Sequence, residues 1–526
     1  MVFTYTPLED IPAVFSDLQK TFRTGKTKPI AYRKEQLAQV AWMLRDHQQE
    51  WADALKADLG RPSLEADFLE INPAISEAKD AYDNVEKWSK TEKARWDMTW
   101  SVMKPQIRKE PKGVVLIITP FNFPVHLTIT HVSSAIAAGN CVVIKPSELC
   151  PAVSELYAEL VPKYLDSETV RVVNGDVPVV SKLLEFPWDH IVYVGSGRVA
   201  KIVAAAAAKH LTPLTTELGG KSPVFIDPNT DFELAAKRVL WGKLANAGQV
   251  CVAPDYVLIP RDAQDRFVEE VKKVYASFYP EGDPSKSDSF SRIITEAHTA
   301  RIKKLIDESK GTVVFGGEAN VQEKYVAPTL LKDVTLDDST MQEEIFGPVL
   351  PIVPVEDVNE AINIVNDREH ALCLYVFSND PKYKAKVFDN TQSGGAIANE
   401  TIIHVGATGL PFGGIGPSGC KTASVLKQST IKLIILYTAG YLSGKYGFDI
   451  LTHHRCTLDN PRWVDTVLMK GRYPPYTEKS TSFLKKMTNV TMPPRFGKAA
   501  SKRWGLWLVF TLLGIVTAVL IKRQTA

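Results

Sequence analysis

The sequence V-V-L-I-I-T-P-F-N-F-P-V-H-L-T-I-T-H-V-S-S-A-I-A-A-G-N-C-V-V-I-K-P, residues 114–146, decides the fold. It contains two short runs of β-branched and aliphatic residues, Val114–Ile118 and Cys141–Ile144, with a segment of helical composition, Val125–Ala138, between them. Short apolar runs joined by a helix are typical of parallel strands that are buried on both faces. This stretch therefore predicts a strand–helix–strand unit of a parallel sheet.

The same alternation continues along the chain. The further strand candidates are Val170–Val173, Ile191–Val194 and Val224–Ile226. The further segments of helical composition are Ala152–Leu165, Val177–Glu185 and Arg198–Lys209. Such alternation predicts an α/β fold with a doubly wound, Rossmann-like parallel sheet. Ligands of these sheets bind beyond the carboxyl ends of the strands, so the residues after each run are candidates for a site.

Composition and charge exclude several classes of protein. The chain has 526 residues, 45% of them hydrophobic and 23% charged, which indicates a globular protein of several domains. A formal net charge of +2 without a concentrated basic patch argues against a nucleic-acid partner. The six cysteines form no C-x-x-C pair, which disfavours a disulfide framework and a metal site and indicates a reducing compartment.

The C-terminal end has the composition of a membrane span. Trp504–Ile521 is free of charged residues, and Lys502, Arg503, Lys522 and Arg523 flank it. As a helix it would be about 27 Å long, close to the hydrocarbon thickness of a bilayer, although a buried core helix is the alternative. Because the N-terminus lacks the pattern of a secretory signal, we expect a single-pass tail anchor with the catalytic part in the cytosol. The endoplasmic reticulum, the mitochondrial outer membrane and the lipid droplet are all compatible membranes.

The N-terminal region is predicted to be helical and then ribbon-like. Ala31–Asp58 carries apolar residues on one helical stripe, and Gly60 and Pro62 end it. Trp96–Glu110 has a strand-like pattern, in which Pro105 indicates an edge strand or hairpin. We expect this small β element to pair with a second subunit in a homodimer.

Asn246–Asp255, N-A-G-Q-V-C-V-A-P-D, carries one cysteine just after a helical run, Glu233–Ala245. The run predicts a helix whose end leads into a glycine-containing turn that presents Cys251. A lone cysteine can also be a small buried hydrophobe. A cysteine protease is disfavoured, because no histidine lies in a motif suited to activate Cys251.

Polar residues and glycines follow the strand candidates. Asn122 comes after the first run, Lys145 and Glu148 come after the second, and G-S-G-R at Gly195–Arg198 follows the fourth. Glycines in such a turn let backbone N–H groups approach an anion at a helix N-terminus. Each feature alone also has an ordinary explanation as a helix cap, a surface pair or a plain turn.

Three later stretches combine carboxylates with glycines. T-E-L-G-G-K-S-P at Thr216–Pro223 places Glu217 before a pair of glycines, and Q-E-E-I-F-G-P at Gln342–Pro348 carries Glu344. L-P-F-G-G-I-G-P-S-G at Leu410–Gly419 is too rich in glycine for a regular helix or strand. Close approach of two backbones is the physical reason for so many glycines.

These stretches, in this order and at this spacing, closely resemble the aldehyde dehydrogenase superfamily, and within it the class 3 fatty aldehyde dehydrogenases with a C-terminal membrane anchor. The resemblance rests on P-F-N-F-P, K-P-S-E, T-E-L-G-G-K-S-P, G-Q-V-C, E-E-I-F-G-P and L-P-F-G-G-I-G. The A-P-D-Y that follows G-Q-V-C and the R-Y-P-P-Y-T-E-K at Arg472–Lys479 are similar to class 3 in particular.

The resemblance implies roles for the catalytic residues. Cys251, as thiolate, attacks the aldehyde carbon, and the Asn122 side-chain amide and the Cys251 backbone N–H donate to the resulting oxyanion. Glu217 is the expected general base for the water that hydrolyses the thioester, with Glu344 as a rival. No metal is implied.

The resemblance also implies NAD as the cofactor, with NADP as an alternative. Lys145 and Glu148 match the positions that hold the adenosine ribose, and Glu344 and Phe346 match those that hold the nicotinamide ribose. The Glu148 carboxylate would accept a bond from a 2′-hydroxyl and repel a 2′-phosphate, which favours NAD. The turn that begins with Gly195 and Ser196 matches the phosphate turn of the family, although Ala200 replaces a second glycine there.

The family also implies how the chain divides into domains. Residues 1–216 would form the NAD-binding domain, with the hairpin at about residues 96–110 for oligomerisation, and residues 217–400 the α/β catalytic domain. Residues 401–500 would return to the cofactor and oligomerisation region and end in a helical segment. One segment, residues 421–440, is an extra insertion relative to the family, and our hypothesis is that it is an unspliced, in-frame piece of a gene prediction, which sequencing of the transcript would decide.

The predicted function is therefore NAD-dependent oxidation of long-chain fatty aldehydes to carboxylic acids through a covalent adduct on Cys251. The same chemistry on an apocarotenoid or another terpenoid aldehyde is one alternative, and a catalytically silent binding or structural protein on the same fold is another. Expected pocket residues are Phe121, Phe123, His126, Tyr256 and His404, and they do not separate the two substrates.

Overall fold

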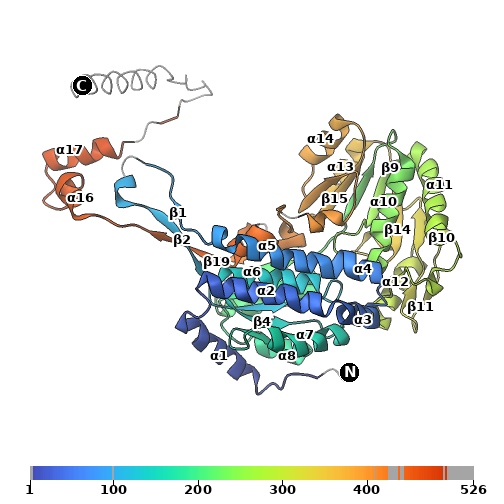
Figure 1. Cartoon of the computed structure of the whole chain (residues 1–526). Helices are drawn as coiled ribbons and strands as arrows, with labels where there is room; N and C mark the ends of the chain where they lie inside the picture. The colour runs from blue at the N-terminus through green and yellow to red at the C-terminus, as the bar shows by residue number, and fades with distance from the viewer. Residues whose placement is uncertain are drawn as a thin grey trace, which may run out of the picture. The chain divides into compact units, whose positions relative to one another are not determined.

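The computed structural model of the chain describes residues 4–97, 100–407, 409–423, 436–438, 443–489 and 492–493. The chain divides into two compact units, which we call the first unit (residues 1–91 and 108–455) and the second unit (residues 92–107 and 456–526) (Figure 1). Within the described ranges, no helix is long and apolar enough to cross a membrane. The expected membrane span, residues 504–521, lies outside these ranges.

The first unit begins with a group of helices. These are α1 (Ile11–Thr24), α2 (Ile30–Asp46), α3 (Gln48–Leu59) and α5 (Asn72–Trp88), with the π-helix η1 (Ala66–Ile71) before α5. Of these, α1 packs on the cofactor-side sheet, whereas the others pack on one another and on the crossover helices of that sheet. The helix predicted over residues 31–58 is interrupted at His47, whose backbone leaves the helical region (φ −116°, ψ 29°). The helix end predicted at Gly60 is confirmed, because Gly60 takes the left-handed conformation (φ 61°) that a C-cap needs.

The cofactor-side sheet has the strand order β18-β17-β7-β6-β3-β4-β5. Its strands are β3 (Val114–Ile118), β4 (Cys141–Lys145), β5 (Val170–Val172), β6 (His190–Val194), β7 (Leu214–Glu217), β17 (Gly419–Ala423) and β18 (Leu436–Thr438). The crossover helices are α6 (His126–Ala138), α7 (Pro151–Tyr164), α8 (Val177–Leu183) and α9 (Gly197–Lys209). The five strands β3 to β7 run parallel, so the parallel sheet predicted from residues 114–146 is confirmed.

Strand β7 is an element that the sequence did not indicate. Its residues L-T-T-E lack an aliphatic run, but the Thr215 hydroxyl lies 2.8 Å from Nε2 of His190 on β6 and is fully buried. Tertiary contact therefore makes a strand of a segment with a weak pattern. The fifth predicted run, Val224–Ile226, is a strand, but it belongs to the second sheet.

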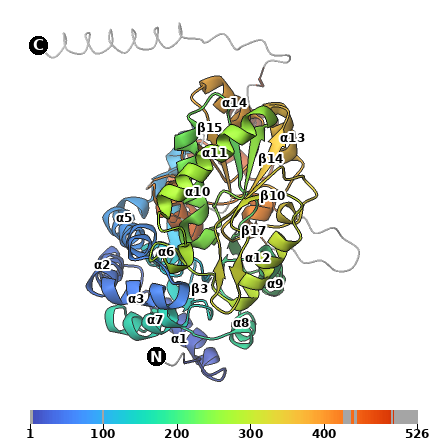
Figure 2. The same ribbon diagram turned by 90° about the vertical axis from the view of Figure 1, so that its right-hand side faces the viewer.

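The second sheet of the first unit has the order β10-β13-β14-β9-β8-β15-β16. Its strands are β8 (Pro223–Ile226), β9 (Tyr256–Pro260), β10 (Thr312–Phe315), β13 (Thr329–Lys332), β14 (Val349–Val355), β15 (Cys373–Phe377) and β16 (Gly395–Ala398). Helices α10 (Phe232–Leu244), α11 (Arg261–Phe278), α12 (Glu296–Asp307), α13 (Val358–Asn366) and α14 (Pro381–Asp389) accompany it (Figure 2). Every neighbouring pair is parallel except β10–β13, and the sheet and its helices share one hydrophobic core.

Part of the unusual segment 421–440 extends the cofactor-side sheet. Strand β17 pairs antiparallel with β7, with Gly419 opposite Glu217 and Lys421 opposite Thr215. Strand β18 then pairs antiparallel with β17, with Lys421 opposite Thr438. The remaining residues of the segment, 424–435 and 439–440, lie outside the described ranges.

The second unit contains a short ribbon and two helices. Strand β1 (Glu92–Lys93) pairs antiparallel with the start of β2 (Gln106–Pro111), and η2 (Ser101–Met103) lies between them. The strand expected over residues 96–110 therefore begins only after Pro105, because η2 takes up the preceding residues. Helices α16 (Arg462–Val467) and α17 (Glu478–Met487) follow later in the chain, and a small core joins Met103 to Val464 and Met469.

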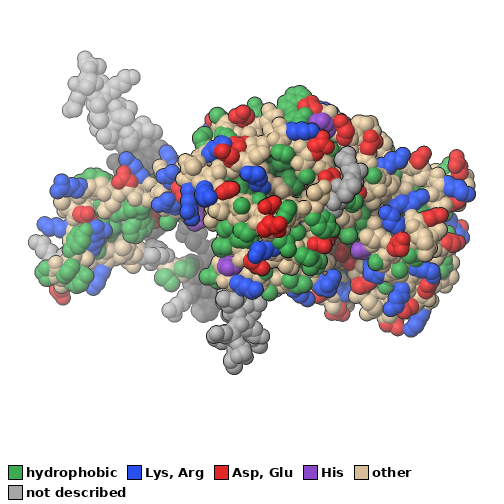
Figure 3. Space-filling view, turned by 90° about the horizontal axis from the view of Figure 1, so that it is seen from below, with side chains coloured by type: hydrophobic (Ala, Val, Ile, Leu, Met, Phe, Trp, Pro, Cys, Tyr) green, Lys and Arg blue, Asp and Glu red, His purple; other side chains and the backbone are tan. Residues whose placement is uncertain are grey.

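Charged side chains of both signs are interspersed on the face of the molecule that Figure 3 shows, in keeping with the formal net charge of +2. Large apolar side chains are also exposed just before and within η1, namely Leu64 and Phe68.

Candidate active site

Cys251 is presented by a left-handed turn at the end of α10. The helix ends at Leu244, and in η3 (Ala245–Gly248) Asn246, Ala247 and Gly248 all have positive φ values of 50°, 51° and 76°. A Cβ atom on Gly248 would lie 2.2 Å from the carbonyl oxygen of Gly347, so only glycine fits at this close approach. The turn thus places Cys251 beside the 342–348 loop.

The Cys251 side chain is half-buried and lies in the wall of a cavity of about 450 Å³. Most of the other lining side chains are apolar, among them Leu69, Phe123, Leu127, Val252, Ile402 and Phe412. Asn72, Ser76, Glu77 and His126 contribute the polar part of the lining. A mostly apolar cavity with a nucleophile and a few polar groups is the usual form of a small-molecule site.

The pocket prediction is right for Phe123 and His126 and wrong for three other residues. Phe121 contacts the rings of His298 and Phe346 on the cofactor side of the site (centroid distances 5.6 and 5.8 Å). His404 lies with its Nε2 atom 3.6 Å from the Cys373 Sγ atom, behind the cavity wall. Tyr256 is buried in β9. Their positions follow from tertiary packing, which the sequence does not specify.

Burial raises the pKa of the Cys251 thiol well above its usual range, and the nearby carboxylates of Glu217 and Glu344 raise this pKa further. Both effects disfavour the negative charge of a thiolate. The thiol therefore needs a base or a bound cationic group to ionise, because the turn itself does not supply the charge.

Asn122 follows β3 and is buried next to the nucleophile turn. Its backbone carbonyl oxygen accepts hydrogen bonds from Arg61 Nη2 (2.6 Å) and from Asn246 Nδ2 (2.9 Å). The same Asn246 amide donates to the carbonyl oxygen of Gln249 (3.1 Å), two residues before Cys251. Asn246 therefore ties the Asn122 loop to the Cys251 turn.

A buried ion pair supports this loop. Arg61 pairs with Glu70, and both side chains are fully buried. The other Glu70 carboxylate oxygen accepts from the backbone N–H groups of Val125 (3.2 Å) and His126 (2.7 Å) at the first turn of α6. The pair thus fixes the chain on both sides of the Phe123–Pro124 bend that follows Asn122.

Glu217 is the last residue of β7, and its carboxylate is buried. One oxygen accepts from the Gly414 backbone N–H (3.2 Å), and the other has no hydrogen-bond partner among the described residues. Burial raises the pKa of Glu217 well above its usual range, and the single bond from Gly414 offsets little of this effect. A buried carboxyl with a raised pKa and a free oxygen suits a general base near neutral pH.

Glu344 lies on the 342–348 loop, packed against the glycine pair in the loop that follows β7. A Cβ atom on Gly219 would lie 2.4 Å from a Glu344 carboxylate oxygen, so the loop approaches because residue 219 is glycine. Burial and the charge of Asp255 raise the pKa of Glu344 to about 8. Both effects disfavour the ionised form of this carboxyl.

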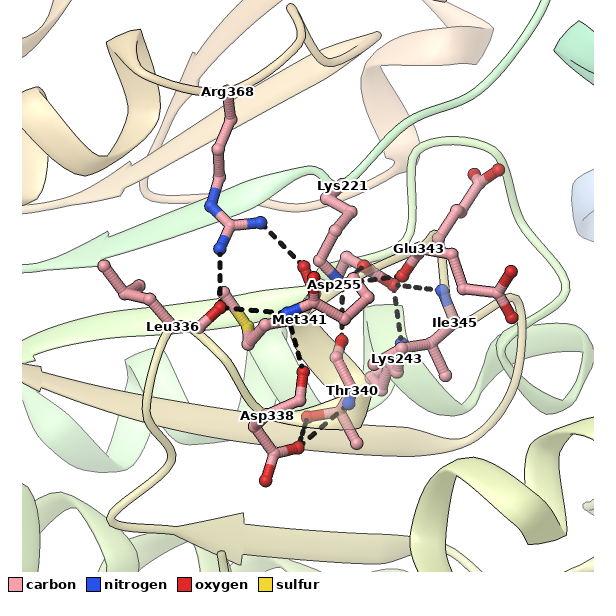
Figure 4. A network of polar contacts seen from close by, with 12 residues as sticks. Lys221, Lys243, Asp255, Leu336, Asp338, Thr340, Met341, Glu343, Ile345 and Arg368 are labelled. Atoms are coloured by element: carbon pink, nitrogen blue, oxygen red, sulfur yellow. Dashed lines mark hydrogen bonds and ion pairs between the residues drawn. The ribbon is translucent and has the colours of Figure 1, made fainter. Parts of the chain in front are cut away.

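A network of buried charges holds the loop that carries Glu344 (Figure 4). Lys221 donates to Asp255 (2.6 Å) and to the backbone carbonyl oxygens of Thr340 (2.7 Å) and Glu343 (2.9 Å). Lys243 Nζ lies 3.5 Å from Asp255, and burial lowers its pKa to about 8. Lys221, Lys243 and Asp255 were not predicted as site residues, although Lys221 lies inside the T-E-L-G-G-K-S-P motif and Asp255 ends the stretch around Cys251.

The residues expected to hold the adenosine ribose lie at the carboxyl end of β4. Lys145 is buried and donates to Glu148 (2.6 Å), and burial lowers the pKa of Lys145. The pairing leaves the Glu148 side chain partly exposed at the end of the sheet where a ligand binds.

The expected phosphate turn follows β6. A Cβ atom on Gly195 would lie 2.4 Å from the Tyr193 hydroxyl oxygen, so the turn closes onto the strand only with glycine. Ser196 caps α9, and its hydroxyl oxygen accepts from the Val199 N–H (3.5 Å). Ala200 is buried in the first turns of α9. The turn, the helix N-terminus and the Lys145–Glu148 pair fit the parts of a dinucleotide.

Phe346 completes the cofactor side of the site. Its φ of 48° is unusual for a bulky residue, and its ring contacts Phe121 edge to face. The expected residues thus form two groups. Asn122, Glu217 and Glu344 lie around Cys251, whereas Lys145 and Glu148 lie at the end of β4 and Gly195 and Ser196 follow β6, with β3 between these two strands. Phe346 lies two residues after Glu344 on the same loop and therefore adjoins the residues around Cys251.

Comparison with known proteins places the chain in a family. The profile of the aldehyde dehydrogenase family matches residues 3–432. Aldehyde dehydrogenase family 3 member A2 of Rattus norvegicus is 39% identical over 508 residues, which are 96% of this chain and 98% of the relative.

Two further relatives carry informative names. The beta-apo-4'-carotenal oxygenase of Neurospora crassa is 38% identical over 93% of this chain and 88% of its own length. The dimeric NADP-preferring aldehyde dehydrogenase of Canis lupus familiaris is 40% identical over 90% of this chain and all of its own length.

The fold matches solved structures as well. The substrate-bound Staphylococcus aureus AldH superimposes with a TM-score of 0.84 at 35% identity and covers 91% of this chain and 99% of its own.

Proposed function

This chain belongs to the aldehyde dehydrogenase family and is an NAD(P)-dependent oxidoreductase, and on that premise we propose that it oxidises long-chain aliphatic aldehydes to carboxylic acids through Cys251. The observation that carries the proposal is the mostly apolar cavity of about 450 Å³ onto which Cys251 opens. Each buried methylene group contributes about 0.8 kcal/mol, so such a cavity favours long chains over short ones.

The residues around the cavity suit the steps of the reaction. The Cys251 thiolate adds to the carbonyl carbon, and the negative charge moves to the oxygen of the thiohemiacetal. The Asn122 side-chain amide and the Cys251 backbone N–H stabilise this oxygen, and each such donor is worth about 3 kcal/mol of the barrier. NAD(P), when bound, supplies the acceptor for the hydride that leaves this carbon. Glu217 then takes a proton from the water that hydrolyses the thioester, and the carboxylic acid and the free thiol result.

The cofactor contacts follow from the two groups of residues. Lys145 and Glu148 would hold the adenosine ribose, Gly195 and Ser196 the phosphates, and Glu344 and Phe346 the nicotinamide ribose. We propose that NAD is preferred, because a 2′-phosphate would meet the Glu148 carboxylate. The canine relative is named as NADP-preferring, so kcat/KM is to be measured with both NAD and NADP.

The proposal is tested by NADH formation with hexadecanal, acetaldehyde and an apocarotenal, each with NAD and with NADP. We expect the highest kcat/KM with hexadecanal and NAD. The Neurospora crassa relative supports the apocarotenal as the second candidate, and a higher kcat/KM with the apocarotenal would select it. A preference for acetaldehyde would contradict both. The family membership leaves the alternative of a silent protein without support.

Glu217→Gln is expected to separate the two halves of the reaction. The amide still fills the site but takes no proton, so a first burst of NADH should remain while steady turnover falls by about 10²- to 10⁴-fold. Because the pKa of Glu217 is raised, wild-type turnover should increase with pH as this carboxyl ionises, and the variant should lose that dependence. Unchanged turnover would assign the base to Glu344, and stopped-flow measurement of NADH distinguishes the outcomes.

We further propose that residues 504–521 anchor the chain in a membrane and that the protein is a homodimer. The uncharged span between basic flanks supports the first proposal, and the name of the canine relative supports the second. Removal of residues 501–526 should shift the protein from the membrane fraction to the soluble fraction. Retention of the shortened chain on membranes would contradict the anchor.

A further inference from the structure

Tyr375 connects the nucleophile turn to the wall of the aldehyde cavity. It lies on β15 and is fully buried. Its hydroxyl donates to the carbonyl oxygen of Val252 (2.5 Å), the residue after Cys251, and accepts from the backbone N–H of Ile402 (3.3 Å). Val252 and Ile402 both line the cavity. One phenol group thus joins two parts of the site that are 150 residues apart in sequence.

Ile402 has a strained backbone. Its φ is 43° and its ψ is −35°, a combination that a β-branched residue rarely takes. Such a conformation persists only where neighbouring groups hold it. The preceding residue is held as well, because the Thr401 hydroxyl donates to the Arg238 carbonyl oxygen (2.8 Å) on α10. The turn at Ile402 is therefore fixed on one side by α10 and on the other by Tyr375.

Without the Tyr375 hydroxyl, the Val252 carbonyl oxygen and the Ile402 N–H would lose a hydrogen-bond partner that water does not readily replace. Val252 is 1% exposed and Ile402 is 4% exposed, so water does not reach their backbone groups freely. A phenol donates one hydrogen bond and accepts others, and this one does both. Cys373, two residues earlier on the same strand and so on the same face, contacts His404, whose ring lies 6.2 Å from the Tyr375 ring. These side chains fill the space behind the wall.

We propose that Tyr375 is a positioning residue that sets the preference for long-chain aldehydes. Its hydroxyl holds the strained turn at Ile402 against the peptide that follows Cys251, and so keeps the cavity wall in the shape that an aliphatic chain contacts. A two-carbon aldehyde occupies only the space next to the Cys251 sulfur and does not reach that wall. The inference rests on the proposed function, because it concerns the binding of a long-chain substrate at Cys251.

Tyr375→Phe removes the hydroxyl and keeps the ring. We expect KM for hexadecanal to rise about tenfold, as the loss of one buried hydrogen-bond pair implies, and KM for acetaldehyde to change less than about twofold. NADH affinity, measured by fluorescence, should stay the same, because Lys145, Glu148, Gly195 and Ser196 belong to the other sheet and Tyr375 makes, among the described residues, no hydrogen bond to the 342–348 loop. A purely structural defect would lower the amount of active enzyme and change both substrates equally, and that result would overturn the proposal.

Tyr32→Phe is the matched control. Its hydroxyl also has two partners, Asp166 (2.9 Å) and Thr169 (2.8 Å), but they lie between α7 and β5 and do not line the cavity. We expect this variant to keep the wild-type ratio of the two KM values. A shift of the ratio equal to that of Tyr375→Phe would show that loss of any hydrogen-bonded phenol hydroxyl changes selectivity, and would contradict the proposal.

Ile402→Gly gives an independent test, because glycine takes positive φ without strain. This variant should raise KM for hexadecanal on its own, and adding Tyr375→Phe should then cause less than about a twofold further change. If the two substitutions raised KM for hexadecanal by independent factors that multiply in the double variant, that result would contradict the proposed coupling between Tyr375 and Ile402. If wild-type enzyme does not prefer hexadecanal, the proposed function fails. If it does and Tyr375→Phe leaves both KM values unchanged, only the inference about Tyr375 fails.

Discussion

Cys251→Ser is expected to lower aldehyde-dependent NADH formation by about 10⁴-fold or more, as removal of a nucleophile does in other covalent enzymes. Burial and the charges of Glu217 and Glu344 already raise the pKa of the thiol. A serine hydroxyl is a much weaker acid, so in the same surroundings it would not ionise. Initial rates with a saturating aldehyde and NAD give the measurement.

The control for this variant is Cys456→Ser. Cys456 is exposed and belongs to the second unit, so its replacement should leave the rate unchanged. The Cys251→Ser protein should also bind NADH with wild-type affinity, which separates loss of the nucleophile from loss of the fold. If Cys251→Ser retained more than about a hundredth of the wild-type rate, the assignment of the nucleophile would be wrong.

Arg61→Ala is expected to lower the free energy of unfolding by about 3–5 kcal/mol, because it leaves the Glu70 carboxylate buried without its partner. The substitution also removes the 2.6 Å bond to the Asn122 carbonyl oxygen and the contact of the guanidinium with the Phe123 ring (4.8 Å). Turnover should therefore fall together with stability. Urea unfolding followed by tryptophan fluorescence measures the stability change.

Two further variants distinguish the effect of the buried charges on stability from the effect of Arg61 on the position of Asn122. Lys79→Ala breaks an exposed ion pair with Asp83 and should leave the unfolding curve in place. Arg61→Met combined with Glu70→Gln removes both charges, while the introduced amide oxygen could still accept from the His126 N–H. This double variant should regain most of the lost stability but not the turnover, because the Asn122 carbonyl oxygen still lacks the Arg61 donor and keeps only the bond from Asn246. Full recovery of turnover would show that Arg61 acts on stability alone.

Much of the fold follows from the sequence because its strands are buried on both faces. Continuous apolar runs such as Val114–Ile118 have few other stable placements, and the polar residues after them mark the end of the sheet where a ligand binds. This is why Asn122, Lys145 and Glu148 stand out. Strand β7 has no such run, because its threonines are buried by contacts with β6 that only the folded chain makes.

The supporting charges of the site could not be read from the sequence in the same way. Arg61 and Glu70 look like surface residues of helical segments, and Lys221, Lys243 and Asp255 come from three separate elements. A charged residue pairs in a protein interior only when the fold brings its partner to it, and that partner can be any opposite charge in the chain. The positive φ of Ile402 has no sequence signal either, because isoleucine is the last residue type that such a backbone suggests.

Because β17 pairs with β7, the site tolerates a change in chain length after β17 but not just before it. Gly414 donates to the Glu217 carboxylate, and five residues later Gly419 lies opposite Glu217 in the sheet. An insertion or deletion of one residue between these two glycines would force β17 out of register with β7 or pull the donor away from the carboxylate. Residues added beyond Ala423, where β17 ends, leave the register of β17 with β7 and the Gly414 hydrogen bond unchanged, so natural length variation at this sheet edge should collect beyond Ala423 and spare the five residues before β17.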